Sequence, residues 1–237
     1  AEVPIGTFDL SEAGPAGYTA SDWVCTGADG STATSVTLGL ADAATCTITN
    51  TAIPPILTLE KRVVNDNGGT AAPTEWTLTG TGPQTITGTT GSPAVTAATV
   101  RVGQYTLSEA DGPTGYTASD WSCVGADLTG STVIVPLGGN VTCTITNNDQ
   151  PAQLSLVKVV DNGMTGATAA PANWTLTASG TTTVTGPGNS PSVTERTVPA
   201  GSYALSESGG PAGYTASAWS CSGGTLTGAS VSVPNGG

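Results

Sequence analysis

Apolar and polar residues alternate along this chain in short segments, as expected for β-strands with one buried face. Between residues 57 and 147 the apolar positions follow one another in this order: Leu57 and Leu59, Trp76 and Leu78, Ile86, Val95 with Val100 and Val102, Tyr105 and Leu107, Trp121 and Cys123, Val133 and Val135, and Cys143 and Ile145. Turn-forming runs such as Asn65–Gly69 separate the segments. The pattern predicts seven to eight short strands packed as an all-β, immunoglobulin-like sandwich.

The pattern repeats along the chain. Trp23, Trp121 and Trp219 recur at intervals of 98 residues, and one tyrosine and one cysteine near each tryptophan keep the same interval. A period of this length is the size of a domain, so each copy is expected to have a core of its own. The sequence therefore predicts a tandem array of β-sandwich repeats.

The copies are unequal in length. The predicted organisation is the C-terminal half of a repeat at 1–50, a linker at 51–56, a complete repeat at 57–148, a linker at 149–153, and a repeat lacking its last strand at 154–237. These are called the first, second and third repeats below. We expect a window on a longer array, with neighbouring repeats as partners; exchange of a strand between chains is the alternative.

Charge and composition exclude several function classes. The chain has seventeen acidic residues and only five basic ones, which argues against nucleic acid and anionic lipid as partners. No apolar run reaches the roughly 20 residues of a membrane helix, so no membrane segment is expected in this window. The chain has no histidine, and its cysteine spacing fits no zinc site. We therefore expect neither a metal nor another cofactor.

Five cysteines in a weakly aromatic chain indicate disulfides and an oxidising, extracellular compartment. The repeat predicts Cys25–Cys46 and Cys123–Cys143 as pairs, and it leaves the partner of Cys221 outside the chain. Each bridge would close a loop of about 20 residues and stabilise the repeat by about 3 kcal/mol.

Three polar residues occupy positions where the alternation predicts the core. Lys61 continues the face of Leu59, Glu109 that of Leu107, and Asn147 follows on the last strand. The other copies place Glu12, Asn50, Lys158 and Glu207 at the corresponding positions, and Lys61 and Lys158 are the only lysines in the chain. Buried charges and amides are costly without partners, so these side chains are expected to meet.

Two kinds of site fit this cluster. One is a buried Lys–Glu ion pair with the asparagine hydrogen-bonded beside it. The other is an isopeptide bond from Lys61 Nζ to the side-chain carbonyl of Asn147, with Asn148 as a possible acceptor that strand parity disfavours. Desolvation favours the neutral amine that such an attack needs, and a protonated Glu109 would polarise the amide. Glu12 and Glu207 would have the same promoting role.

The sequence around the glutamate resembles a known family. Tyr105-Thr-Leu-Ser-Glu109 followed by Pro113-Thr-Gly-Tyr116 is similar to the motif of collagen-adhesin B-type, or SpaA-like pilin, domains with a prealbumin-like fold. The other copies carry it as Phe8–Glu12 with Pro15–Tyr18 and as Tyr203–Glu207 with Pro211–Tyr214. The resemblance implies the Lys–Glu–Asn isopeptide triad. The cysteines beside the last strand depart from the usual pilin pattern.

We expect a structural segment of a secreted bacterial surface stalk, pilus-like fibre or giant adhesin, with possible self-assembly into filaments. The alternative is an adhesin module that binds a host protein or glycan. An enzyme is not expected, beyond a single self-crosslinking event per domain, because the chain offers no histidine, metal cluster or nucleophile elbow.

Overall fold

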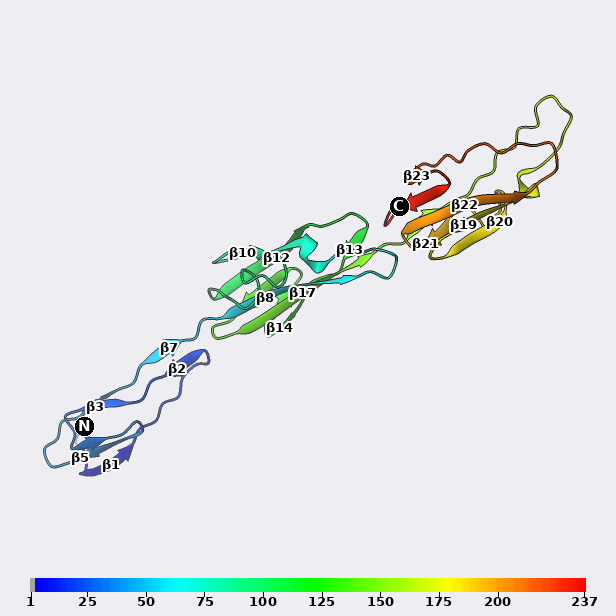
Figure 1. Cartoon of the computed structure of the whole chain (residues 1–237). Coiled ribbons are helices and arrows are strands. Elements are labelled where there is room, and N and C mark those ends of the chain that lie inside the picture. Colours follow the sequence, from blue (N-terminus) through cyan, green and yellow to red (C-terminus); the bar gives the residue numbers. More distant parts are fainter. Residues whose placement is uncertain (1–2) are drawn as a thin grey trace. The chain divides into compact units, whose positions relative to one another are not determined.

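The computed structural model describes residues 3–237, so the first two residues of the predicted first repeat lie outside the described chain. The described residues form short β-strands and two 3-10 turns, η1 (Pro73–Glu75) and η2 (Pro171–Asn173) (Figure 1). They are organised as two compact units. One contains the chain up to Glu60 with Leu78–Glu109 and Trp121–Thr144, and the other contains Lys61–Thr77, Ala110–Asp120 and Ile145–Gly237.

The second repeat is a complete two-sheet structure. Its strands are β8 (Ile56–Val64), β9 (Trp76–Thr81), β10 (Ile86–Gly88), β11 (Ala98–Thr99), β12 (Gly103–Asp111), β13 (Tyr116–Ala118), β14 (Ser122–Val124), β15 (Leu128–Thr129), β16 (Thr132–Val135) and β17 (Asn140–Asp149). One sheet has the order β10-β9-β12-β16-β15, and the other β11-β8-β17-β13, with β14 also paired to β17. The all-β sandwich is confirmed, with ten strands where seven to eight were expected, because several are only two or three residues long.

The core of the second repeat comes from the alternating positions. Leu57 and Leu59 of β8 and Leu78 of β9 are fully buried, and so is Tyr105 of β12. The polar residues between them face outward, which is why the sequence pattern locates these strands correctly. Val102 lies near β11 but outside it, and its side chain is 48% exposed.

The first repeat has one small sheet and two strand pairs. β5 (Ser35–Leu38) lies between β1 (Gly6–Asp9) and β4 (Gly30–Ser31), while β2 (Tyr18–Ala20) pairs with β7 (Asn50–Ala52) and β3 (Val24–Thr26) with β6 (Thr45–Thr47). Among its described hydrophobic residues only Val36 is buried. Glu12 and Asn50, expected to face a core, are exposed, and the described strands of this repeat include no counterparts of β8 and β9.

The third repeat reproduces one sheet of the second repeat. β20 (Thr183–Pro187), β19 (Trp174–Ser179), β22 (Gly201–Gly209), β24 (Ser230–Val233) and β23 (Thr225–Thr227) follow the order of β10-β9-β12-β16-β15. The other sheet is reduced to β18 (Ala152–Leu154) paired with β21 (Arg196–Val198). Residues 155–160, which correspond to most of β8, form no strand. The repeat nevertheless has a core that includes Leu156, Leu176, Val193 and Tyr203.

Both expected disulfides are present. Cys25 of β3 is bonded to Cys46 of β6, and Cys123 of β14 to Cys143 of β17. In each case the two cysteines are directly paired across neighbouring antiparallel strands. Cys221 is a free, exposed thiol. Each disulfide therefore ties the strand that begins directly after Trp23 or Trp121 to a strand near the end of the same repeat.

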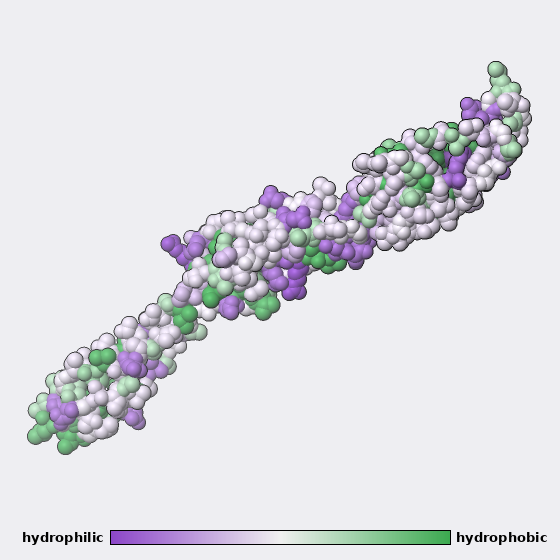
Figure 2. All heavy atoms as spheres, in the orientation of Figure 1, coloured by the Kyte–Doolittle hydropathy of each residue, from purple (hydrophilic) through white to green (hydrophobic). Residues whose placement is uncertain are grey.

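Most of the visible surface has intermediate hydropathy, with scattered hydrophilic and hydrophobic patches (Figure 2). In the described part of the chain, none of the helical segments has the length and apolar character of a membrane span. Residues 3–237 also hold no cluster of three or more cysteine, aspartate or glutamate side chains arranged to bind a metal ion.

Candidate functional site

The second repeat places two of the predicted polar residues on neighbouring strands of one sheet. Lys61 lies on β8 and Asn147 on β17, and each is only 3% exposed. Asn148 is exposed, so the inward-facing amide is that of Asn147. Glu109 lies on β12 and is half-buried, two positions after the buried Leu107. The strand parity that selected these residues from the sequence is therefore correct.

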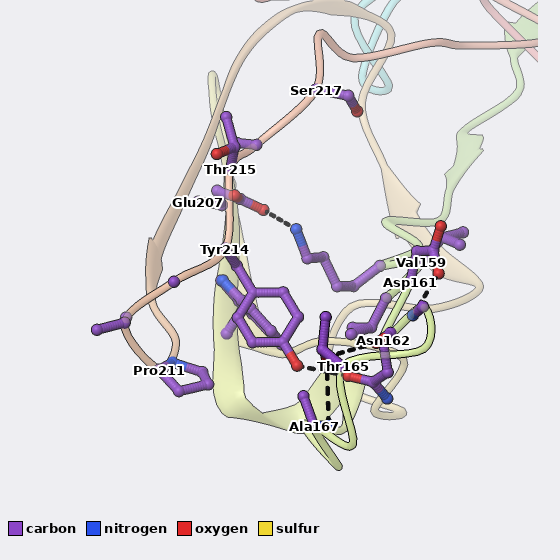
Figure 3. A pocket seen from close by; sticks show the side chains of 18 residues that line it. Val159, Asp161, Asn162, Thr165, Ala167, Glu207, Pro211, Tyr214, Thr215 and Ser217 are labelled. Atoms are coloured by element: carbon purple, nitrogen blue, oxygen red, sulfur yellow. Dashed lines mark hydrogen bonds and ion pairs between the residues drawn. The ribbon is translucent and has the colours of Figure 1, made fainter.

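The third repeat brings its lysine and glutamate into direct contact. Lys158 Nζ donates to Glu207 Oε2 at 2.7 Å, an ion pair drawn as a dashed line in Figure 3. The two side chains are 15% and 22% exposed. Glu207 stands opposite Leu176 in the pairing of β19 with β22, which directs it toward the inside of the repeat.

The first repeat brings its glutamate and asparagine together. Asn50 Nδ2 donates a hydrogen bond to Glu12 Oε2 at 3.0 Å. The third repeat thus shows the contact between lysine and glutamate, and the first repeat shows the contact between asparagine and glutamate. Only the second repeat has a lysine, a glutamate and an asparagine at all three of these equivalent positions.

A tryptophan lies beside each lysine. Lys61 Nζ is 4.8 Å from the ring centroid of Trp76, and Lys158 Nζ is at the same distance from Trp174. An aromatic face at this distance attracts a cation and also excludes water from it. Each lysine is therefore held in place by its strand and by an aromatic wall.

A tyrosine supports that wall from the side. Tyr116 packs edge-on against Trp76 with ring centroids 5.3 Å apart, and its hydroxyl donates to Asn65 Oδ1 at 2.6 Å. The same hydroxyl accepts a hydrogen bond from the backbone N–H of Ala71. Tyr214, Trp174 and Asn162 repeat the arrangement in the third repeat, with centroids 5.2 Å apart. The tyrosine that ends the Pro-x-Gly-Tyr motif therefore fixes both the tryptophan and the turn after the lysine strand.

Asp149 forms a second buried polar centre, at the end of β17. The sequence analysis assigned it to a linker, but its side chain is fully buried. Its carboxylate accepts backbone hydrogen bonds from Asp66 at 2.9 Å, Asn67 at 2.8 Å and Gly69 at 2.7 Å. Burial by itself raises the pKa of Asp149, but these N–H groups and the Asn67 amide together hold the pKa below its ordinary value. The ionised carboxylate thus organises the turn that follows β8.

An open pocket of about 740 Å³ adjoins the lysine of the third repeat (Figure 3). Lys158, Trp174, Glu207 and Tyr214 line it. In the second repeat the counterparts of Lys158 and Tyr214 lie on β8 and β13, the two strands that flank β17 in the sheet. The pocket is accordingly the face against which a last strand packs, rather than an enclosed ligand cavity.

The sequence analysis found the lysine, glutamate and asparagine but missed the supporting residues. Trp76 was identified only as an apolar position of a strand, and Tyr116 only as the end of the family motif, although both residues recur in the third repeat as Trp174 and Tyr214. Asp149 gave no signal, because the backbone N–H groups that bind it can only be located once the turn is folded.

A β-sandwich that repeats along the chain, with a lysine and an asparagine buried on neighbouring strands of the second repeat, defines a class of structural repeat domain. A family profile described as a prealbumin-like fold domain of the SpaA type matches residues 1–48, 53–145 and 149–237. The chain therefore belongs to the SpaA-like family of prealbumin-fold domains, whose members are structural modules of surface pilins and adhesins. No curated protein and no solved structure is significantly similar to the chain.

Proposed function

We propose that this chain is a load-bearing segment of a secreted bacterial surface stalk or pilus-like fibre, in which an isopeptide bond joins Lys61 to Asn147 within the second repeat. The observation that carries the proposal is the presence of both residues, almost fully buried, on neighbouring strands of one sheet. Family membership supports a structural role, and the disulfides fit an extracellular protein.

The partial repeats support the role assigned to the glutamate. Glu207 binds the lysine of its repeat, and Glu12 binds the asparagine of its repeat. A glutamate able to contact both groups can take a proton from the amine and give one to the amide. We assign this promoting role to Glu109 in the second repeat.

The proposed reaction needs no external reagent. The neutral Lys61 amine attacks Cγ of Asn147, a new C–N bond forms, and the bond from Cγ to the asparagine nitrogen breaks. The departing nitrogen leaves as ammonia after gaining a proton through Glu109. No electrons are transferred, and the net change for the protein is the loss of one ammonia.

The position of the proposed bond would allow it to carry mechanical load. Lys61 lies on the first strand of the repeat and Asn147 on the last, so tension applied along the array enters and leaves the repeat through these strands. A covalent bond between them would let the load bypass the hydrogen-bonded core. The Cys123–Cys143 bridge ties the last strand a second time.

Intact mass of the full 237-residue chain under reducing conditions tests this proposal. The expected result is a mass one ammonia below the value calculated from the sequence, and a proteolytic peptide that links the β8 and β17 segments. Lys61→Arg and Glu109→Gln are expected to restore the full mass.

Lys158→Arg is the matched control. Lys158 lies beside a tryptophan as Lys61 does, and it pairs with Glu207, but no counterpart of β17 is among the described strands of its repeat. This variant should keep the mass deficit of the second repeat. A wild-type chain with the full calculated mass would refute the crosslink and leave a non-covalent polar cluster.

A further inference from the structure

The backbone between the first and second repeats is hydrogen-bonded on both sides. Ile53 N–H donates to Gly17 O at 2.8 Å, and Gly138 N–H donates to Ile53 O at 2.9 Å. Ile56 N–H donates to Gly139 O at 2.8 Å. Gly17 belongs to the Pro-x-Gly-Tyr loop of the first repeat, while Gly138 and Gly139 form a turn of the second. The linker residue Ile53 is thus held between the two repeats within one compact unit.

The junction between the second and third repeats has the same three hydrogen bonds. Gln150 N–H donates to Gly115 O at 2.8 Å, Gly236 N–H to Gln150 O at 2.9 Å, and Gln153 N–H to Gly237 O at 2.7 Å. These residues lie within the other compact unit. The two linkers differ in sequence, so the recurrence comes from backbone geometry rather than from particular side chains.

The glycine of the Pro-x-Gly-Tyr loop is closely approached at both junctions. Gly17 has φ +89°, and a Cβ atom there would lie 2.8 Å from the carbonyl oxygen of Leu137. Gly115 has φ +83°, and a Cβ atom there would overlap the carbonyl oxygen of Asn235. Gly213 has the same loop conformation, with φ +94°, but no atom lies within 4 Å of its Cβ position. The close approach is therefore a property of the junction and not of the loop.

A further contact joins the Asp149-bound turn of the second repeat to the third repeat. Ala200 N–H donates to Asn67 O at 2.7 Å, and a Cβ atom on Gly68 would overlap the Ala200 carbonyl oxygen. The Asp149 carboxylate fixes this turn through the N–H of Asn67. The buried charge at the end of the second repeat therefore shapes a surface that contacts the next repeat.

The turn of the first repeat that corresponds to the Leu137–Gly138 turn is exposed. Leu40, the counterpart of the half-buried Leu137, is 91% exposed. Ala41 follows it with φ 68°, which matches φ 67° at Gly138, so the turn itself is the same. The Leu40 turn thus has the conformation of the docking turn without an occupant.

We infer that consecutive repeats dock through a specific interface made of the linker backbone, the Pro-x-Gly-Tyr loop of the preceding repeat and the Gly-Gly turn of the following one. Its partner is another repeat of this kind, and the Leu40 turn is the surface that such a repeat covers. A short covalent linker presents the two surfaces to each other at high effective concentration, so a small interface is sufficient. This inference holds whether or not the isopeptide bond forms.

Amide hydrogen exchange in the full chain, resolved by NMR, tests the inference with Gly17→Ala. In the wild type, the amides of Ile53, Ile56 and Gly138 are expected to be protected. In the variant their exchange should accelerate about tenfold or more, because local opening of the junction becomes easier. The amide of Leu59, which donates to Val95 O inside the second repeat, should remain protected and so report that the repeat is folded.

Gly213→Ala is the matched control, since it has the same backbone strain but no neighbour to displace. Gly138→Ala is a second test, because Ala41 shows that alanine fits this turn, whereas a Cβ at Gly138 would lie 3.0 Å from Gly17 Cα. It should accelerate exchange at Ile53 as Gly17→Ala does. Unprotected junction amides in the wild type, or equal protection in Gly17→Ala and Gly213→Ala, would overturn the inference.

Discussion

The second and third repeats each contain a single lysine, at equivalent positions. The neighbouring side chains show how a lysine is accommodated there. Lys61 is buried beside Trp76, and Lys158 is paired with Glu207 beside Trp174. A long cationic side chain in such a place is stabilised by an oxygen partner and by an aromatic face. Lys158 has both in Glu207 and Trp174, and Lys61 has the aromatic face of Trp76.

A residue of the site could be predicted where the pattern of its own strand reveals it, but not where its role depends on contacts with a distant part of the chain. The lysine, glutamate and asparagine break a two-residue alternation, so the sequence reveals them without a structure. Asp149 and Tyr116 act through a turn that comes from a distant part of the chain, with Asp149 binding Asn67 and Tyr116 binding Asn65. Alternation contains no information about such contacts, and both roles were missed.

Replacement of Asp149 by asparagine is expected to destabilise the second repeat by about 2 kcal/mol at pH 7, because buried N–H groups lose a charged acceptor. Since the folded-state pKa of Asp149 is lowered, its stabilising contribution is complete above about pH 4 and is lost as the pH falls through the folded-state pKa. Thermal unfolding of both proteins at several pH values measures this difference. Asp120→Asn, at an exposed position, is the control. A gap between wild type and Asp149→Asn that widens below pH 4 would contradict the account.

At the scale of elements, β17 organises much of its sheet. It pairs with β13 and β14 and borders β8, which is nine residues long in its presence. In the third repeat, where no corresponding strand is described, the counterpart of β8 is only Ala152–Leu154. The counterparts of β13 and β14, within residues 214–222, form no strand. Alternation in the sequence predicted strands in both repeats, but a strand forms only where its neighbour provides hydrogen bonds.

A synthetic peptide with the sequence of residues 140–149 is therefore expected to bind the third repeat. Cys123 and Cys143 are paired in the second repeat, so the peptide cysteine should face Cys221. Under mildly oxidising conditions the mixed disulfide should form faster than with a scrambled peptide of the same composition. Mass spectrometry measures the two rates. Equal rates would show that the third repeat has no register-specific site for this strand.

At the scale of the whole molecule, the chain is a series of repeats that are strengthened at three levels. A disulfide ties β3 to β6 in the first repeat and β14 to β17 in the second, the proposed isopeptide bond closes the second, and the junctions repeat one set of hydrogen bonds. The sequence predicted the repeat and the cysteine pairs from spacing alone. It did not predict the junction contacts, because glycine-rich loops give no pattern that distinguishes a docked turn from an exposed one.

Single-molecule stretching of the reduced chain, held at its two ends, tests the central claim most directly. The account predicts that the segment between Lys61 and Asn147 does not extend in the wild type, because the load passes through the covalent bond between them. In Lys61→Ala the same segment should unfold and add its full length to the extension. Equal extensions for the wild type and Lys61→Ala would show that the second repeat bears load without a covalent bond between its first and last strands, and would contradict the account.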